Sequence, residues 1–266
     1  MAATTRRSPD ARGARAPEGP GHPVAEPVRA LRRRTTAAQG RLLRFDATER
    51  LVHWVTATVV VSLAVTGAAL YAPSFGALVG HRLVVEDLHV WAGVAVFLPL
   101  LAGAAGPWGR RLRHDLRQVR DLGPAEMDWL RSLGRRGRSA LGKFNPGQKL
   151  NTNALAGILT VLFATGLLLR WGNFLPVSAR TGATFVHDVA AFLLVGLVTA
   201  HVGLALAHPK ALRSMLLGWV PADWARRHAP AWRAEELSPG GPQRGPADAA
   251  DEGRHQRPGP HRCRPG

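Results

Sequence analysis

The sequence predicts an all-α integral membrane protein that is built as a four-helix bundle. Its mean hydropathy is near zero, but this average conceals a sharp segregation of apolar and charged residues along the chain. Four apolar runs have about the 17–25 residues that a helix needs to cross the hydrocarbon core of a bilayer. The runs cover residues 51–72, 88–105, 153–169 and 184–207.

The four predicted helices differ in their regularity. The run 51–72 contains almost no charge. The run 88–105 contains Pro99, which has no backbone N–H to donate and therefore predicts a kink. The runs 153–169 and 184–207 are again almost free of charge. After them, residues 210–232 mix leucine, methionine, tryptophan and arginine, which predicts an interfacial amphipathic helix.

Two other classes of protein are less compatible with this pattern. Buried helices of a soluble protein are also apolar on all sides, but four such runs in one chain of 266 residues favour a membrane bundle. The formal net charge of +17 would suggest a nucleic-acid partner if the basic residues formed a patch on a soluble fold. Here the arginines flank the apolar runs, so we expect a lipid bilayer as partner and no nucleic acid.

The ends of the chain differ from its middle. Residues 1–43 and 233–266 are rich in arginine, alanine, proline and glycine, which predicts disordered basic tails around a membrane domain of residues 44–232. No cleavable signal peptide is apparent, because the first apolar run begins near Leu51. The single cysteine, Cys263, lies in the C-terminal tail and excludes a disulfide framework within one chain.

The distribution of lysine and arginine predicts the orientation of the helices. Eleven of these residues precede the first helix, eleven lie in the loop 106–150, and ten follow His208. The loops 73–87 and 171–183 contain one each, Arg82 and Arg180. Because basic loops stay in the cytoplasm, both termini are expected to be cytoplasmic, in a multi-pass protein of the bacterial inner membrane.

Four histidines in or beside the predicted spans are the main candidates for function, because histidine is costly in a membrane without a partner. His53 and His201 fall near the cytoplasmic ends of their helices, whereas His89 and His187 fall at the outer ends. Two histidines at each level, on different helices, are what two stacked haems with paired imidazole ligands require. The alternatives are isolated histidines that bond helices together, another metal site, or His81 in place of His89.

A step of fourteen residues supports the haem interpretation. His187 and His201 are fourteen residues apart, which is close to four helical turns and about 21 Å of rise, so both imidazoles project from nearly one face. Gly67 and Gly103 follow His53 and His89 by the same step. These glycines either make room for a porphyrin or allow close packing between membrane helices.

The loop before the third helix is a second candidate site. It reads Gly-Lys-Phe-Asn-Pro-Gly-Gln-Lys over residues 142–149, at the cytoplasmic membrane surface. An amide side chain and a backbone N–H exposed by glycine are suited to bond a quinone carbonyl, but composition alone favours an ordinary helix-entry turn.

Arg44, Arg50 and Arg170 at helix ends are candidates to pair haem propionates, or simply to reach the membrane interface. No catalytic dyad, triad, phosphate loop or dinucleotide fingerprint is present in the sequence.

Taken together, these residues resemble the gamma (cytochrome b556) subunit of membrane-bound formate dehydrogenases, within the wider group of bacterial di-haem cytochromes b. The resemblance covers about residues 44–232. The matching positions are 44–46, 49–54, His89, Gly93, 142–149, His187, His201, Met215, Gly218, Trp224, Ala225 and 228–230. Pro146 departs from the family, which also accepts a small residue at this position, and predicts a stiffer loop.

The resemblance implies a set of ligands for two haems b. It pairs His53 with His201 on the cytoplasmic side and His89 with His187 on the outer side, as axial ligands of the iron. It also implies that Asn145, Gly147 and Gln148 contact a quinone, either menaquinone or ubiquinone, beside the cytoplasmic haem.

The implied function is that of the electron-transfer subunit of an oxidoreductase, which passes electrons to the quinone and does not itself oxidise formate. Its implied partners are an iron–sulfur beta subunit and a molybdenum or tungsten alpha subunit. The alternatives are the cytochrome b subunit of a hydrogenase or of a thiosulfate or polysulfide reductase, a stand-alone b561-type carrier, and a haem-free membrane anchor.

Overall fold

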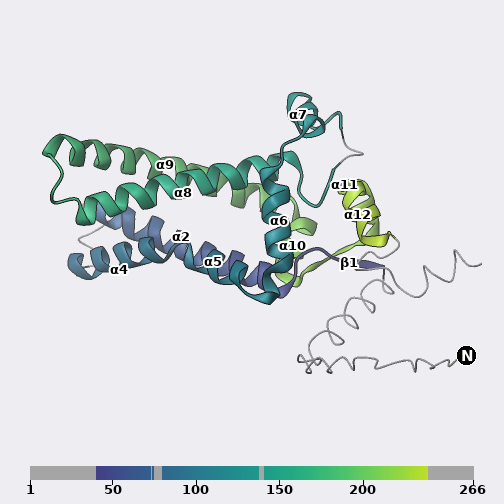
Figure 1. Cartoon of the computed structure of the whole chain (residues 1–266), viewed down its shortest axis with the longest axis horizontal. Coiled ribbons are helices and arrows are strands. Elements are labelled where there is room, and N and C mark those ends of the chain that lie inside the picture. The colour runs from purple at the N-terminus through teal and green to yellow at the C-terminus, as the bar shows by residue number, and fades with distance from the viewer. Residues whose placement is uncertain (1–39, 73, 75–79, 138–140, 239–266) are drawn as a thin grey trace, which may run out of the picture.

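Four long helical segments run side by side and form the body of the molecule (Figure 1). The computed structural model of the chain describes residues 40–72, 74, 80–137 and 141–238. The segments are α2 (Ala47–Tyr71), α4 and α5 (Arg82–Ala95 and Leu98–Ala105), α8 (Pro146–Trp171) and α9 (Val177–Ala207). Each has the length and composition to cross a membrane. The predicted all-α membrane bundle is therefore confirmed.

The helices begin earlier than their apolar runs because polar residues cap them. Asp46 accepts a hydrogen bond from the backbone of Glu49, and the Glu49 carboxylate accepts one from the backbone of Asp46. This reciprocal capping box starts α2 before the apolar run. Asn145 and Gln148 cap α8 in the same way, so this helix begins at Pro146 rather than near residue 153.

The second membrane segment is broken in its middle. Helix α4 ends at Ala95 and α5 begins at Leu98, with Val96 and Phe97 between them. Pro99 stands in the first turn of α5, where its missing N–H leaves no bond to Ala95 and its ring excludes a continuous helix. The kink that Pro99 predicts is present.

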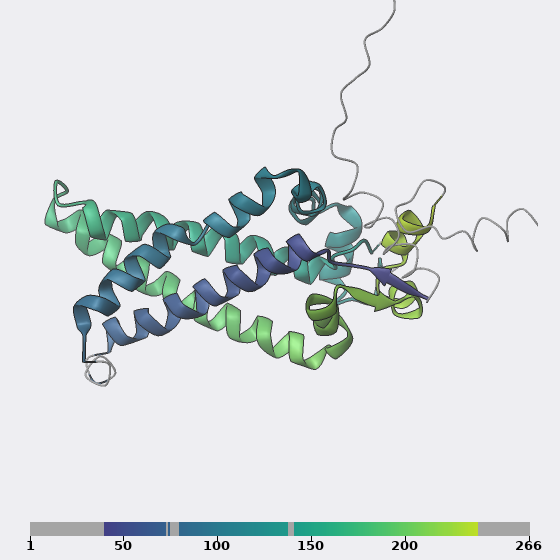
Figure 2. The same ribbon diagram turned by 90° about the horizontal axis from the view of Figure 1, so that it is seen from below.

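The shorter elements gather at one end of the bundle, which we call the capped end (Figures 1 and 2). Helix α6 (Arg110–Arg120) follows the 3₁₀ turn η1 (Pro107–Gly109), crosses the ends of the long helices and leads to α7 (Pro124–Arg131). Strand β1 (Arg41–Leu43) pairs antiparallel with β2 (Trp219–Pro221). Helices α10 (Pro209–Leu217), α11 (Ala222–His228) and α12 (Pro230–Leu237) complete the cap.

The cap corrects two expectations for the ends of the membrane domain. Order extends past residues 44–232 on both sides, because β1 precedes residue 44 and α12 continues to Leu237. The expected single amphipathic helix over 210–232 is wrong, because Gly218 ends α10 in the left-handed conformation (φ 91°) and the chain turns into β2. The remainder of both predicted tails lies outside the described residues.

Two apolar cores hold the molecule together. One lies in the cap, where Leu42 of β1 packs with Val220, Trp224 and Trp232. The other lies inside the bundle and is built on Val60, Val96 and Leu194. Each of these three residues follows a candidate histidine by seven residues, or about two helical turns. This second core, which we call the apolar layer, therefore lies halfway between the two levels of histidines.

Candidate functional site

The four candidate histidines form two pairs at opposite ends of the bundle. Near the capped end, the ring centroids of His53 on α2 and His201 on α9 are 6.3 Å apart, with an angle of 54° between the ring planes. Near the far end, the centroids of His89 on α4 and His187 on α9 are 6.4 Å apart, at 69°. The fold thus brings together the same pairs that the resemblance implies.

Both separations fit two imidazoles on opposite sides of one iron. A histidine nitrogen lies about 2 Å from a bound metal ion, so the centroids of two such rings lie roughly 6 Å apart. All four histidines are only partly buried by the protein. His81, the alternative to His89, is exposed at the start of α4 and lies outside these ring pairs.

Threonine hydroxyls fix the orientation of the far-end pair. Thr66 donates its proton to the carbonyl of Ser62 (2.7 Å), so its oxygen is left to accept a hydrogen bond from His89 Nδ1, at 2.9 Å. Thr165 holds His187 Nδ1 at the same distance, 2.9 Å. A proton on Nδ1 leaves the Nε2 lone pair of each ring free to bind a metal ion.

An asparagine lies against the other pair. The Asn151 amide nitrogen on α8 is 3.3 Å from His201 Nδ1, and in this position the amide donates to the imidazole. With the amide turned by 180°, its oxygen would instead accept the Nδ1 proton and select the same tautomer as the threonines do.

Sequence reasoning missed these partners, although the sequence contains a signal for them. Asn151 and Thr165 are fourteen residues apart on α8, the same step that separates His201 and His187 on the neighbouring helix α9. A polar pair that repeats the histidine step on an adjacent span indicates side chains that contact the candidate histidines.

The glycines of the fourteen-residue step have different neighbours. A Cβ on Gly67 would lie 3.2 Å from Cε1 of His89, so this glycine leaves room for the imidazole. Gly166, directly after Thr165, has a corresponding place 3.5 Å from His187. A Cβ on Gly103 would lie only 2.3 Å from Val52, which is a contact between α5 and α2. Gly103 therefore serves helix packing, the alternative that the sequence left open.

The candidate quinone residues form the N-terminal cap of α8. The Asn145 carboxamide oxygen accepts from the backbone of Gln148 (2.8 Å), and the Gln148 oxygen accepts from the backbone of Asn145 (3.1 Å). Gly147 lies between them, with Asn145 Oδ1 3.3 Å from the position of a Cβ. The caps use only the oxygens, and no bond from either amide NH₂ group to another described residue is seen. These two donors suit a carbonyl acceptor such as that of a quinone.

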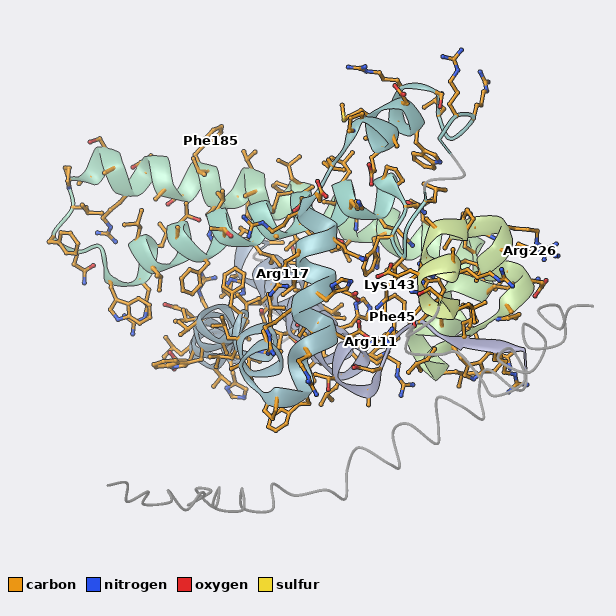
Figure 3. All side chains as sticks on the ribbon, turned by 45° about the vertical axis from the view of Figure 1, so that its right-hand side comes forward. Phe45, Arg111, Arg117, Lys143, Phe185 and Arg226 are labelled. Carbon is orange, nitrogen blue, oxygen red and sulfur yellow. The ribbon has the colours of Figure 1, made fainter. Side chains whose placement is uncertain are left out.

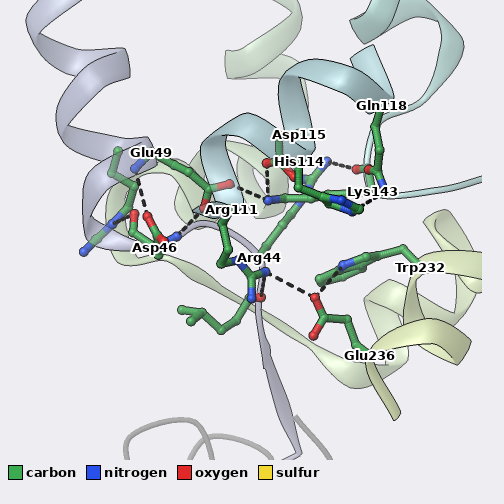
Figure 4. Close-up of polar contacts among 12 residues, drawn as sticks. Arg44, Asp46, Glu49, Arg111, His114, Asp115, Gln118, Lys143, Trp232 and Glu236 are labelled. Atoms are coloured by element: carbon green, nitrogen blue, oxygen red, sulfur yellow. Dashed lines mark hydrogen bonds and ion pairs between the residues drawn. The ribbon is translucent and has the colours of Figure 1, made fainter. Parts of the chain in front are cut away.

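A buried cluster of charges lies beside this loop (Figure 4). Lys143 bonds Glu49 at 2.7 Å and also forms an ion pair with Asp115 of α6. Arg44 donates to the Lys143 carbonyl (2.9 Å) and reaches Gln148 at 3.4 Å. Burial, opposed by the charge of Asp115, lowers the pKa of the Arg44 guanidinium from 12.5 to about 10. Figure 3 shows Lys143 and Phe45 where the bundle meets the cap.

The three candidate propionate partners have different surroundings. Arg44 is buried, with its guanidinium 4.9 Å from the centre of the Trp224 ring. Arg50 donates to the carbonyl of Leu216 at 2.6 Å and ties α2 to α10. Arg170 lies over Trp171, at the far end of α8. Arg44 and Arg50 are thus bound to the protein at the capped end.

Comparison with known proteins identifies relatives by sequence. The cytochrome b556(fdo) subunit of formate dehydrogenase from Escherichia coli K12 is 28% identical over 202 residues, which cover 73% of this chain and 92% of that protein. The cytochrome b556 subunit of formate dehydrogenase from Haemophilus influenzae is 23% identical over 205 residues, covering 74% and 84%. The nitrate-inducible cytochrome b556(Fdn) subunit from Escherichia coli K12 is 23% identical over 206 residues, covering 73% and 91%.

The family model for prokaryotic cytochrome b561 matches residues 44–218. The match spans all four membrane segments and ends at Gly218, the residue that terminates α10. It contains both histidine pairs, the threonines and the asparagine that contact them, and the cap of α8. The chain therefore belongs to the prokaryotic cytochrome b561 family, whose members bind haem b in the membrane.

Proposed function

We propose that this chain is the membrane cytochrome b subunit of a formate dehydrogenase complex and that it passes electrons through two haems b to a quinone. The observation that carries the proposal is the presence of two histidine pairs at opposite ends of one bundle. The names of the three relatives support formate as the source of the electrons.

The histidines are proposed to coordinate the haem irons, and the neighbouring threonines are proposed to orient the histidines. His53 and His201 would hold the haem iron near the capped end, and His89 and His187 would hold the one near the far end. The haems supply reversible one-electron transfer when bound. Thr66 and Thr165 keep the far-end imidazoles in the tautomer that presents Nε2. The polypeptide thus positions two redox centres on either side of the apolar layer.

The quinone is proposed to bind at the capped end, where Asn145 and Gln148 offer their NH₂ groups. The proposed orientation places this end and both termini on the cytoplasmic side of the inner membrane, in accord with the arginine-rich cap. An iron–sulfur subunit, fed by a molybdenum or tungsten subunit that oxidises formate to carbon dioxide, would dock at the far end. Two electrons and two protons convert the quinone to quinol.

Replacement of His201 tests the assignment of the haems. We expect His201→Ala to remove the haem near the capped end and to leave the other, so that the haem b content falls from two per chain to about one. A reduced-minus-oxidised spectrum with quantitation of extracted haem measures this. His208→Ala is the matched control, because His208 caps the same helix and its ring bonds the carbonyl of Leu204, away from both histidine pairs. Retention of both haems in His201→Ala would refute the pairing.

The electron donor requires a separate measurement. The family match is equally compatible with the cytochrome b subunit of a hydrogenase and with a stand-alone carrier, whereas the relatives' names favour formate dehydrogenase. Purification of the chain with its bound subunits, followed by formate-dependent reduction of the haems, decides between them. Reduction of haem b by hydrogen but not by formate would replace the proposed donor.

A further inference from the structure

A cavity opens between α6 and α12 at the capped end of the molecule. Its volume is about 250 Å³, which is enough for several water molecules. Eight of the nine residues that line it are polar or charged, although much of the lining surface comes from the apolar parts of their side chains. They include Arg111, His114, Asp115, Gln118, Lys143 and Glu236.

Asp115 and Lys143 lie both in the wall of this cavity and in the buried charge cluster (Figure 4). Lys143 bridges the carboxylates of Asp115 and Glu49, which come from two different helices, α6 and α2. Its side chain is 3% exposed, and those of Asp115 and Glu49 are 9% and 4% exposed. A chain of contacting polar side chains therefore runs from the cavity through Asp115 and Lys143 to Glu49.

The charges of the cluster favour an additional proton. Two carboxyl groups share the single ammonium of Lys143, and burial makes a second negative charge costly. Burial, followed by the interaction with the Glu49 side chain, raises the pKa of Asp115 from 3.8 to about 8. The Asp115 carboxylate in turn raises the pKa of Arg44 against the effect of burial. Arg110, Arg111 and His114 of the same helix line the cavity with Asp115, as do Glu235 and Glu236 of α12.

The cluster adjoins the proposed quinone site. Lys143 precedes Asn145 by two residues, and the Arg44 guanidinium bonds both the Lys143 carbonyl and Gln148. On the other side, Glu49 precedes His53 by four residues, so the two side chains lie one turn apart on α2. Acidic side chains in this position stand between bulk water and the place where a quinone would be reduced.

We propose that Asp115, with Lys143 and Glu49, is a proton-loading site that takes protons from the cavity and supplies them to the quinone. The proposal rests on the proposed function. Each quinone would take two electrons from the haems and two protons from the Asp115 carboxyl, one after the other, giving quinol. Each time, the resulting carboxylate, stabilised by Lys143, is protonated again by a proton that enters from the bulk solution through the cavity. Intramembrane and membrane-edge carboxylates are suited to such a role.

Infrared difference spectroscopy of the whole complex in lipid discs tests the loading site without turnover. We expect a protonated carboxyl band that disappears as the pH rises through about 8. The band should be absent in Asp115→Asn and shifted in Asp115→Glu. Glu235→Gln is the matched control, because Glu235 is an exposed acid at the same cavity and lies outside the cluster. Wild-type complex without a titrating carboxyl band, or a band that persists in Asp115→Asn, would overturn the proposal.

Formate-driven reduction of decylubiquinone and menadione tests the role in turnover. In Asp115→Asn we expect reduction to slow by about 100-fold, the usual loss when a proton donor is removed, while formate still reduces both haems. Asp115→Glu should restore most of the rate, and Glu235→Gln should leave it unchanged. A wild-type rate in Asp115→Asn at every pH would contradict the inference alone. Wild-type complex that reduces neither quinone would instead contradict the proposed function, while the infrared titration still reports on Asp115.

Discussion

Thr66 and Thr165 determine which imidazole nitrogen each histidine of the far-end pair leaves free for a metal ion. Each hydroxyl has one proton, which it donates to a carbonyl one turn earlier in its own helix. The hydroxyl oxygen can then only accept from the histidine. Two residues that read as ordinary helix-forming threonines in the sequence thereby set the tautomer of His89 and His187.

Replacement of Thr66 by valine removes this acceptor at nearly constant volume. We expect the midpoint potential of the far-end haem to rise in Thr66→Val, because His89 becomes a weaker electron donor without a hydrogen bond on Nδ1. A redox titration of the haem b absorption measures the shift, and the potential of the other haem should stay unchanged. Thr58→Val is the control, since Thr58 bonds only the carbonyl of Trp54 on the same helix. A shift of both potentials, or of neither, would count against the assignment.

The helical elements were predictable in their apolar middles but not at their ends. Hydropathy located all four spans, because lipid-facing helices are apolar on every side. The first turns of α2 and α8 are polar, and they are helical because of the reciprocal caps at Asp46 and Asn145. The break before Pro99 followed directly from the missing N–H of proline.

The contacts around the sites were only partly predictable for a related reason. The distribution of lysine and arginine placed the histidines at two levels, and the fourteen-residue step placed His187 and His201 on one helical face, but the pairing came from the family resemblance. The bridge from Lys143 to Glu49 and Asp115 joins residues 94 and 28 positions apart. No local pattern signals a bridge of that kind, because the crossing of α6 over the bundle creates it.

Packing between α5 and α2 depends on Gly103. We expect Gly103→Ala to lower the free energy of unfolding by about 1–3 kcal/mol, because the new methyl group would overlap Val52. Thermal unfolding in detergent, followed by loss of the helical circular dichroism signal, measures this change. Gly157→Ala is the matched control, since a Cβ there meets nothing within 4 Å. Equal stability of the two variants would contradict the prediction and would show that α5 can shift away from Val52 without loss of stability.

On the scale of the whole molecule, the buried cluster links stability to pH. The pKa of Asp115 is raised from 3.8 to about 8, so the folded protein retains a proton there that the unfolded chain releases. Stability contributed by this group is therefore present at low pH and is lost as the pH rises toward 8. We expect Asp115→Asn to become more stable relative to wild type between about pH 5 and pH 8.

Unfolding midpoints measured across this range check the effect, with Glu235→Gln as the variant that should keep the wild-type pH dependence. A stability difference between Asp115→Asn and wild type that does not vary with pH would show that Asp115 is ionised throughout.

The apolar layer of Val60, Val96 and Leu194 also has an electrical consequence. It is a thin insulator, and most of the voltage across the membrane falls between the two levels of histidines. The two levels of histidines are about 21 Å apart along the helices, which is roughly two thirds of the thickness of the hydrocarbon core. In the proposed orientation the capped end faces the negatively charged cytoplasm. Moving one electron toward that end therefore costs about 1.5 kcal/mol of electrical free energy for each 100 mV across the membrane. A voltage across the membrane should therefore hold electrons on the proposed far-end haem, and collapse of the voltage should release them.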